Sequence, residues 1–196
     1  MFLIINRTPF PDEVVAVDKD IFTYLNGFGE EKWDWFWLLI TEQKHWIPLF
    51  ILLLYLLFKA FGLKKGLVLI VFTALFITFS DQLVNVIKHH YMRLRPCNDP
   101  DLELSIRAVL HRSSYSFISG HSTTSFAMST FFILLLKPYF KNIRFLLIWP
   151  LLFAYSRVYL GVHFPLDIFT GMYVGLIEGL LFFYITKFSL KKIFEN

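Results

Sequence analysis

The stretch Tyr155–Asp167, YSRVYLGVHFPLD, lies between two apolar runs and holds three residues with the chemistry of a catalytic site. Arg157 precedes His163 by six residues, and Asp167 follows His163 by four. Residues four apart on a helix share a face, so the Asp167 carboxylate is expected to reach the His163 ring and fix its tautomer. A histidine held in this way can act as a nucleophile or base, and a guanidinium suits a phosphate. For the His–Asp pair alone, a polar helix end at a membrane surface is the plain alternative.

The composition around this stretch is typical of a membrane protein. Apolar residues make up 56% of the 196 residues and charged residues 17%, against roughly 45–50% and about 25% in soluble domains. The basic residues lie in short loops between long apolar runs, a pattern that favours a membrane bilayer over nucleic acid as partner. The single cysteine, Cys97, excludes an intrachain disulfide. No cleavable signal peptide is expected, because the apolar segment Met1–Ile5 is short.

Five apolar runs are candidate membrane spans, with approximate ranges 46–62, 66–87, 119–136, 145–160 and 166–188. We therefore expect an all-α fold, a polytopic membrane bundle of five or six transmembrane helices in a single domain, residues 1–196, with its transmembrane core over residues 46–188.

The first 45 residues are expected to form interfacial helices rather than a span. Ile21–Gly29 predicts a short helix ending in glycines, and Trp33–Ile40 falls well short of the ~20 residues that cross a bilayer. Half-buried packing helices are an equal alternative for residues 20–44. A sixth span built from residues 20–40 would move the N-terminal segment to the other side.

The distribution of positive charge predicts the orientation. Basic loops at 59–65, at 137–144 and in the C-terminal tail alternate with polar segments at 88–118 and 157–166. Five spans place all the basic loops on one side, which the positive-inside rule makes cytoplasmic, so both polar segments face outward. We expect a multi-pass protein of the bacterial inner (plasma) membrane with its site on the periplasmic or extracellular side.

Three glycines in the last span are spaced every four residues. Gly171, Gly175 and Gly179 allow a neighbouring helix to approach closely. Internal packing is the expected use of this stripe, in preference to a dimer contact, and the sequence leaves the oligomeric state open.

A second polar cluster lies at the outer end of the second span. Lys88 and Arg95 are seven residues apart, two helical turns, so both are expected to point the same way. Asp81 and Asn85 continue that face inward. Headgroup anchoring is the alternative use of the two cations.

A third polar cluster, Ser116–Thr124 (SFISGHSTT), lies at the start of the third span and contains Ser119-Gly120-His121. Gly120 allows backbone to approach a ligand, and the N–H groups of a helix N-terminus form a ready anion site with His121 beside it. Ordinary helix capping is the alternative for Ser119.

Together the three clusters predict a phosphate site with a nucleophile and an acid, at the ends of three spans. No metal is expected, because the residues lack a cysteine cluster or a compact carboxylate set. The alternative is that the loop histidines recruit one, namely His89, His90 and His111.

The combined pattern resembles the type 2 phosphatidic acid phosphatase (PAP2) superfamily, with its motifs K-x6-R-P, P-S-G-H and S-R-x5-H-x3-D. Ile118 stands where the second motif usually has proline, which affects the shape of that turn. The N-terminal segment and Ile40-Thr41-Glu42 are similar to the compact bacterial undecaprenyl pyrophosphate phosphatases of this superfamily. The matching residues are Lys88, Arg95-Pro96, Ser119-Gly120-His121, Ser156-Arg157, His163 and Asp167.

The resemblance implies a PAP2/haloperoxidase-like core and a role for each residue. His163 would form a phosphohistidine, Asp167 would orient it, and His121 would protonate the leaving oxygen and then activate water. The phosphoryl oxygens would be held, without metal or cofactor, by Lys88, Arg95, Arg157 and the backbone at Ser119 and Gly120.

The expected substrate is a lipid phosphate or pyrophosphate, foremost undecaprenyl pyrophosphate. Phosphatidylglycerophosphate and lipid A phosphates are alternatives, as is transfer of the phosphate to another lipid by the same residues. A non-enzymatic transporter or lipid-binding protein is a third hypothesis, prompted by the intramembrane carboxylates Asp81 and Glu178.

Overall fold

The computed structural model describes residues 8–194, and every regular element in this range is helical. This confirms the all-α prediction for the described residues, while Met1–Ile5 lie outside them. Short 3₁₀ segments occupy Glu31–Trp33, Gln43–Trp46, Pro96–Asn98 and Lys141–Leu147. The α-helices are α1 (Asp12–Asn26), α2 (Asp34–Thr41), α3 (Ile47–Tyr91), α4 (Gly120–Leu136), α5 (Ile148–Tyr159) and α6 (Pro165–Phe194).

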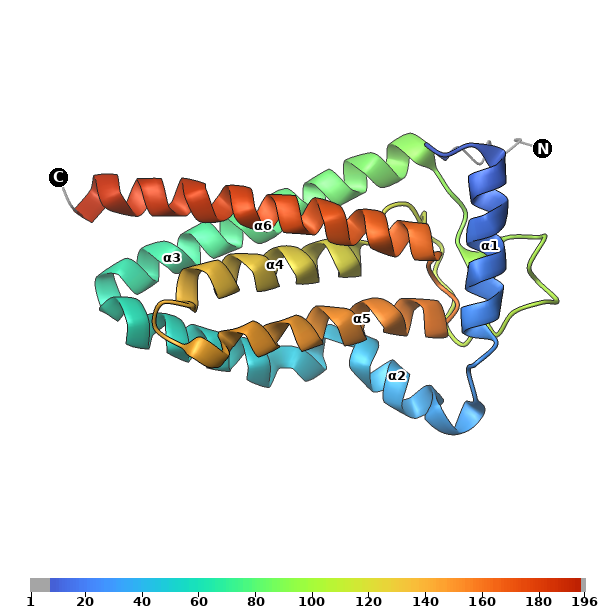
Figure 1. Ribbon diagram of the computed structural model, residues 1–196, viewed down its shortest axis with the longest axis horizontal. Coiled ribbons are helices and arrows are strands. Elements are labelled where there is room, and N and C mark those ends of the chain that lie inside the picture. The colour runs from blue at the N-terminus through green and yellow to red at the C-terminus, as the bar shows by residue number, and fades with distance from the viewer. Residues whose placement is uncertain (1–7, 195–196) are drawn as a thin grey trace.

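Helix α3 is a hairpin of two arms rather than one straight rod. Gly62 has φ 69° and ψ 178°, outside the helical region, and the chain reverses there. Figure 1 shows the two arms meeting at the end of the molecule that carries the C-terminus. Because other L-residues are strained at such a φ, glycine suits this bend. The arms correspond to the expected spans 46–62 and 66–87.

The two arms of α3 run alongside α4, α5 and α6 between the two ends of an elongated bundle (Figure 1). One end gathers the predicted basic loops. The Lys65 ammonium lies 5.6 Å from the Phe194 ring centroid, and the rings of Phe61 and Tyr139 are 5.1 Å apart. The polar segments lie at the opposite end, as the five-span scheme predicts.

Two helical regions of the described chain are long and apolar enough to cross a membrane, Gln43–Asn98 and Pro165–Phe194. Helix α5 has 12 residues, which extend about 18 Å, against a hydrocarbon core of about 30 Å. Its expected range of 145–160 was wrong at the start, because Lys141–Leu147 form a 3₁₀ segment instead. The number of spans, five or six, stays a prediction.

The glycine stripe of α6 packs against α4, which confirms its predicted internal use. A Cβ atom on Gly175 would lie 2.3 Å from the Thr123 carbonyl oxygen, and one on Gly179 would lie 2.5 Å from that of Ala127. Both distances are shorter than van der Waals contact, so this helix pair needs residues without a side chain. The close packing fixes the start of α6 beside the start of α4.

Helix α1 crosses the polar end of the bundle (Figure 1) and packs on α5 and α6. Phe22 is fully buried in a cluster with Leu102, Val158 and Phe164. The predicted start at Ile21 was wrong, since the helix begins at Asp12. Asp12 and Glu13 occupy its first turn directly after Pro11, where acidic residues stabilise a helix N-terminus.

Candidate active site

Lys88 and Arg95 come together at the end of α3, but not for the predicted reason. Helix α3 ends at Tyr91, and Met92, with φ 50°, turns the chain away, so the two cations do not share one helix. Lys88 Nζ donates to the Tyr115 carbonyl over 2.7 Å. Arg95 Nε donates to the Ser114 carbonyl over 2.6 Å. The loop before α4 therefore orients both side chains.

The start of α4 is fixed against the start of α6. The Ser119 N–H donates to the Asp167 carbonyl over 3.0 Å, and Ser119 Oγ accepts from the Ser122 N–H over 3.4 Å. The Ser119 side chain is thus a buried helix cap, which was the alternative reading of this residue. Gly120 and His121 follow it and line the cavity described below.

His163 is buried in the turn before α6 and makes two contacts that define its ring. Its Nδ1 lies 3.4 Å from Asp167 Oδ2, which confirms the predicted pairing, although only Asp167 is on the helix. Its Nε2 lies 2.9 Å from Arg95 Nη1. A guanidinium can only donate, so Nε2 accepts and Nδ1 carries the proton. Nε2 is then the unprotonated nitrogen, and its lone pair accepts the hydrogen bond from Arg95.

The surroundings of His163 favour its neutral form. Burial lowers the pKa of His163 well below its ordinary value, and the positive charges of Arg95, Lys88 and Arg157 lower it further. The neutral imidazole is the form that can attack phosphorus. The same surroundings that would bind an anion therefore keep this histidine unprotonated.

Ser116 belongs to the predicted cluster Ser116–Thr124, but no role was predicted for it. Its hydroxyl donates a short hydrogen bond to Asp167 Oδ2 and lies 3.4 Å from His163 Nδ1. The Phe164 N–H donates to the same carboxylate oxygen over 2.9 Å. These partners hold the Asp167 carboxylate behind His163. Ser116 lies outside the three family motifs and 51 residues from Asp167, so its contact with that carboxylate was not predictable from a local pattern.

A polar cavity of about 390 Å³ brings the predicted residues together. Ser119 and Asp167 are not in its lining and support it from behind. Arg157 lines it and donates through Nη1 to the Thr41 hydroxyl. Arg112, Asp81 and Asn85 also line the cavity, so Asp81 belongs to this site. The predicted residues in the lining are Lys88, Arg95, Gly120, His121, Arg157 and His163.

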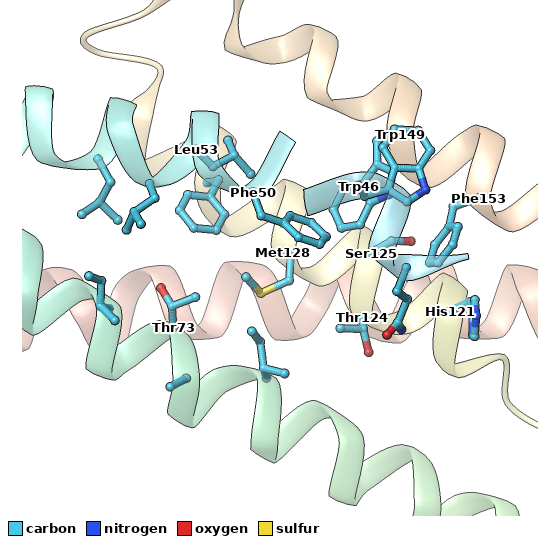
Figure 2. Close-up of a pocket in the computed structure, with 17 residues that line it drawn as sticks. Trp46, Phe50, Leu53, Thr73, His121, Thr124, Ser125, Met128, Trp149 and Phe153 are labelled. Atoms are coloured by element: carbon cyan, nitrogen blue, oxygen red, sulfur yellow. The ribbon is translucent and has the colours of Figure 1, made fainter. Parts of the chain in front are cut away.

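An apolar groove of about 480 Å³ continues from the polar cavity, with Gln43, His121 and Thr124 lining both. It runs between the arms of α3, with α4 and α5 contributing further side chains. Figure 2 shows His121 at one end and a row of aromatic and aliphatic side chains leading away from it. Sequence reading did not predict the groove. Its labelled apolar residues are Trp46, Phe50, Leu53, Met128, Trp149 and Phe153.

Three charged residues of the loop between α3 and α4 pair with residues of α1 and α2 outside the cavity lining. Lys19 pairs with Asp99 and Asp101 at 2.8 Å each, and Arg107 pairs with Asp34 at 2.8 Å. Within residues 8–194, no three histidine, cysteine or carboxylate side chains gather as a metal site would require, so the loop histidines do not form one there.

Comparison with known proteins agrees with this arrangement. The PAP2 superfamily model matches residues 65–191. The lipid A 4'-phosphatase of Bacteroides thetaiotaomicron is 32% identical over 173 residues, covering 86% of this chain and 76% of that protein. The undecaprenyl-diphosphatase of Sulfolobus acidocaldarius is 35% identical over 133 residues, covering 66% and 58%.

The fold has a close counterpart among solved structures. The crystal structure of the transmembrane PAP2-type phosphatidylglycerolphosphate phosphatase from Bacillus subtilis aligns with a TM-score of 0.70 and 24% identity, over 93% of this chain and 89% of that one. The segment matched by the family model contains all the predicted site residues, from Lys88 to Asp167. Because the fold, the motifs and the extent of the family match agree, this chain belongs to the PAP2 superfamily.

Proposed function

We propose that this protein is a membrane-embedded phosphatase that releases inorganic phosphate from a phosphorylated glycolipid of the lipid A type through a phosphohistidine. The observation that carries the proposal is the continuity of the two cavities. A polar cavity with converging cations and histidines opens into an apolar groove, and His121 lines both. A phosphate joined to a long apolar chain fits this pair of surfaces.

The first chemical step is assigned to His163. Its Nε2 attacks phosphorus, an N–P bond forms, and the P–O bond to the lipid breaks. His121, at the junction with the groove, gives a proton to the departing oxygen. Lys88, Arg95 and Arg157 hold the non-bridging oxygens, where charge accumulates in the transition state.

The second step returns the enzyme to its starting state. His121, now unprotonated, accepts a proton from water as the water attacks the phosphohistidine. The N–P bond breaks, and inorganic phosphate leaves. Asp167 keeps the His163 Nδ1 proton in place throughout, so that Nε2 alone carries the phosphoryl group.

The apolar groove accounts for the lipid part of the substrate. Its lining is almost wholly hydrocarbon from the two arms of α3, α4 and α5, so an alkyl chain that enters it from the bilayer exchanges one apolar environment for another. The chain would lie parallel to the helices while the phosphate occupies the polar end.

The comparisons favour the lipid A alternative over undecaprenyl pyrophosphate, which was the foremost expectation. The similarity to the lipid A 4'-phosphatase extends over 86% of this chain, against 66% for the undecaprenyl-diphosphatase. That longer match supports a substrate with a phosphorylated sugar headgroup. The proposed setting is the bacterial inner membrane, with the site facing outward, because the basic loops lie at the far end of the bundle.

A substrate panel tests the proposal. Phosphate release by the purified protein in detergent with EDTA is measured on lipid A bearing a 4'-phosphate, undecaprenyl pyrophosphate and phosphatidylglycerophosphate, with His163→Ala as the blank. The proposal predicts the highest kcat/KM on the lipid A phosphate. A higher kcat/KM on undecaprenyl pyrophosphate would change the proposed substrate class but leave the proposed chemistry in place. No release from any of the three would overturn the function.

A further inference from the structure

Arg93 forms a buried link between helix α1 and the carboxylate behind His163. Its side chain is 1% exposed. Nη1 donates to Asp167 Oδ1 over 2.7 Å, and Nη2 donates to Asp18 Oδ2 over 2.7 Å. The guanidinium carbon also lies 4.1 Å from the ring centroid of Phe164. A planar fork that spans two carboxylates and packs on a ring has little freedom to move.

The two oxygens of Asp167 have different partners. Oδ2 accepts from Ser116 and the Phe164 N–H and faces His163, whereas Oδ1 accepts from Arg93. Arg93 therefore fixes the rotation of the carboxylate. Asp18 is fixed in turn, because its Oδ1 accepts from the Leu166 N–H over 2.9 Å. The chain of contacts runs from α1 to the first turn of α6.

Charge gives Asp18 a second effect on Asp167. Asp18 and Asp167 both pair with Arg93, so the three groups together carry one net negative charge beside His163. Without Asp18, the charge of Arg93 would act on Asp167 alone and would oppose the positive charge that develops on the imidazole as its N–P bond forms. Such effects are strong in a buried, water-poor site.

We propose that Asp18 and Arg93 are positioning residues of the phosphatase, which orient and charge-balance Asp167 and make helix α1 a working part of the site. The inference rests on the proposed function. It assigns the N-terminal helix a role in the rate of the chemical step that is distinct from anchoring at the membrane. Neither residue lines the polar cavity, so neither is expected to affect substrate binding directly.

The test is Asp18→Asn, assayed on the best lipid phosphate of the panel. Asn keeps the shape of Asp18 and an oxygen that can accept from the Leu166 N–H, but it lacks the negative charge that pairs with Arg93. We expect kcat to fall about 10-fold, within the usual range for coupled pairs, while KM changes by less than about twofold. Single-turnover measurements can also follow slow variants. In such measurements, adding Asp18→Asn to an Asp167→Asn variant should cause no further fall in the rate.

Lys19→Ala is the matched control, because it removes the contacts of α1 with Asp99 and Asp101 but does not touch Asp167. Its kcat should stay near that of the wild type. If Asp18→Asn fails to fold, Arg93→Lys replaces it, since an ammonium keeps the charge but lacks the planar fork whose Nη1 and Nη2 each donate to one carboxylate, and kcat should again fall with KM unchanged.

The outcomes separate the inference from the function beneath it. An active wild type with unchanged kcat in the Asp18 variant, or a loss that is just as large when Asp167 is Asn, would overturn the positioning role alone. A wild type that releases no phosphate would overturn the proposed function and the inference with it.

Discussion

The guanidinium of Arg95 donates a hydrogen bond over 2.9 Å to Nε2 of His163, the ring nitrogen that faces the polar cavity. This contact fixes the tautomer from the cavity side, as Asp167 does from the opposite side. It also places a permanent positive charge beside the nitrogen that is proposed to attack phosphorus. One arginine therefore orients His163, the proposed nucleophile, and would bind a phosphoryl oxygen in the proposed reaction.

Ser116→Ala is expected to lower kcat by about 10-fold or more with little change in KM. The hydroxyl donates to the buried Asp167 carboxylate, and a hydrogen bond to a charged group contributes about 1.5–3 kcal/mol. Steady-state phosphate release measures the effect. Ser113→Ala, on the exposed part of the same loop, is the control. Equal rates for the two variants would show that Ser116 does not contribute to the reaction.

Ala74→Trp is expected to raise KM for a long-chain lipid phosphate by about 10-fold, a loss of about 1.4 kcal/mol. Ala74 lines the apolar groove, so an indole there would occupy space needed by the chain. A short, water-soluble phosphate monoester should be hydrolysed as before. Leu75→Trp alters the next residue, which is exposed and outside the groove lining. Identical behaviour of the two variants would contradict the assignment of the groove.

The depressed pKa of His163 predicts a pH effect on stability. At about pH 6.5 and below, the unfolded chain protonates this histidine and the folded chain does not. The unfolded state then binds more protons, so the stability present at neutral pH is lost as the pH falls. Thermal midpoints between about pH 7.5 and 5.5 should fall more for the wild type than for His163→Gln. Parallel curves would show that the histidine is not held neutral.

Impermeant thiol labelling of intact cells tests the orientation. In a Cys97→Ala background, Leu104→Cys places a thiol on a fully exposed residue at the polar end, and Asn142→Cys places one in a basic loop at the other end. We expect the first to be labelled directly and the second only after permeabilisation. The reverse result would turn the site toward the cytoplasm.

Much of the architecture was predictable because it depends on local patterns. Apolar runs and basic loops located the helices, and the spacing of Gly171, Gly175 and Gly179 indicated a close helix contact, which the structure shows to be with α4. The motif residues also gather at one end as expected. The reason given for Lys88 and Arg95 was wrong, since a single residue with positive φ, Met92, ended the helix between them.

The supporting contacts were not predictable, because they join distant parts of the chain. Asp18 and Arg93 are 75 residues apart, and Ser116 and Asp167 are 51 apart. Hydrophobic periodicity says nothing about which buried charge will meet another. The groove was missed for a similar reason: its walls come from both arms of a helix that bends at Gly62, and neither arm alone forms it.

Rapid-quench analysis of the wild type and His163→Ala, with lipid A labelled in its 4'-phosphate and in detergent with EDTA, tests whether His163 carries the phosphoryl group. The wild type should release phosphate and transiently carry label in an acid-labile, base-stable bond, as a phosphohistidine does. His163→Ala, folded to the same thermal midpoint, should do neither. Phosphate release by His163→Ala at a rate near that of the wild type would show that His163 is not the nucleophile.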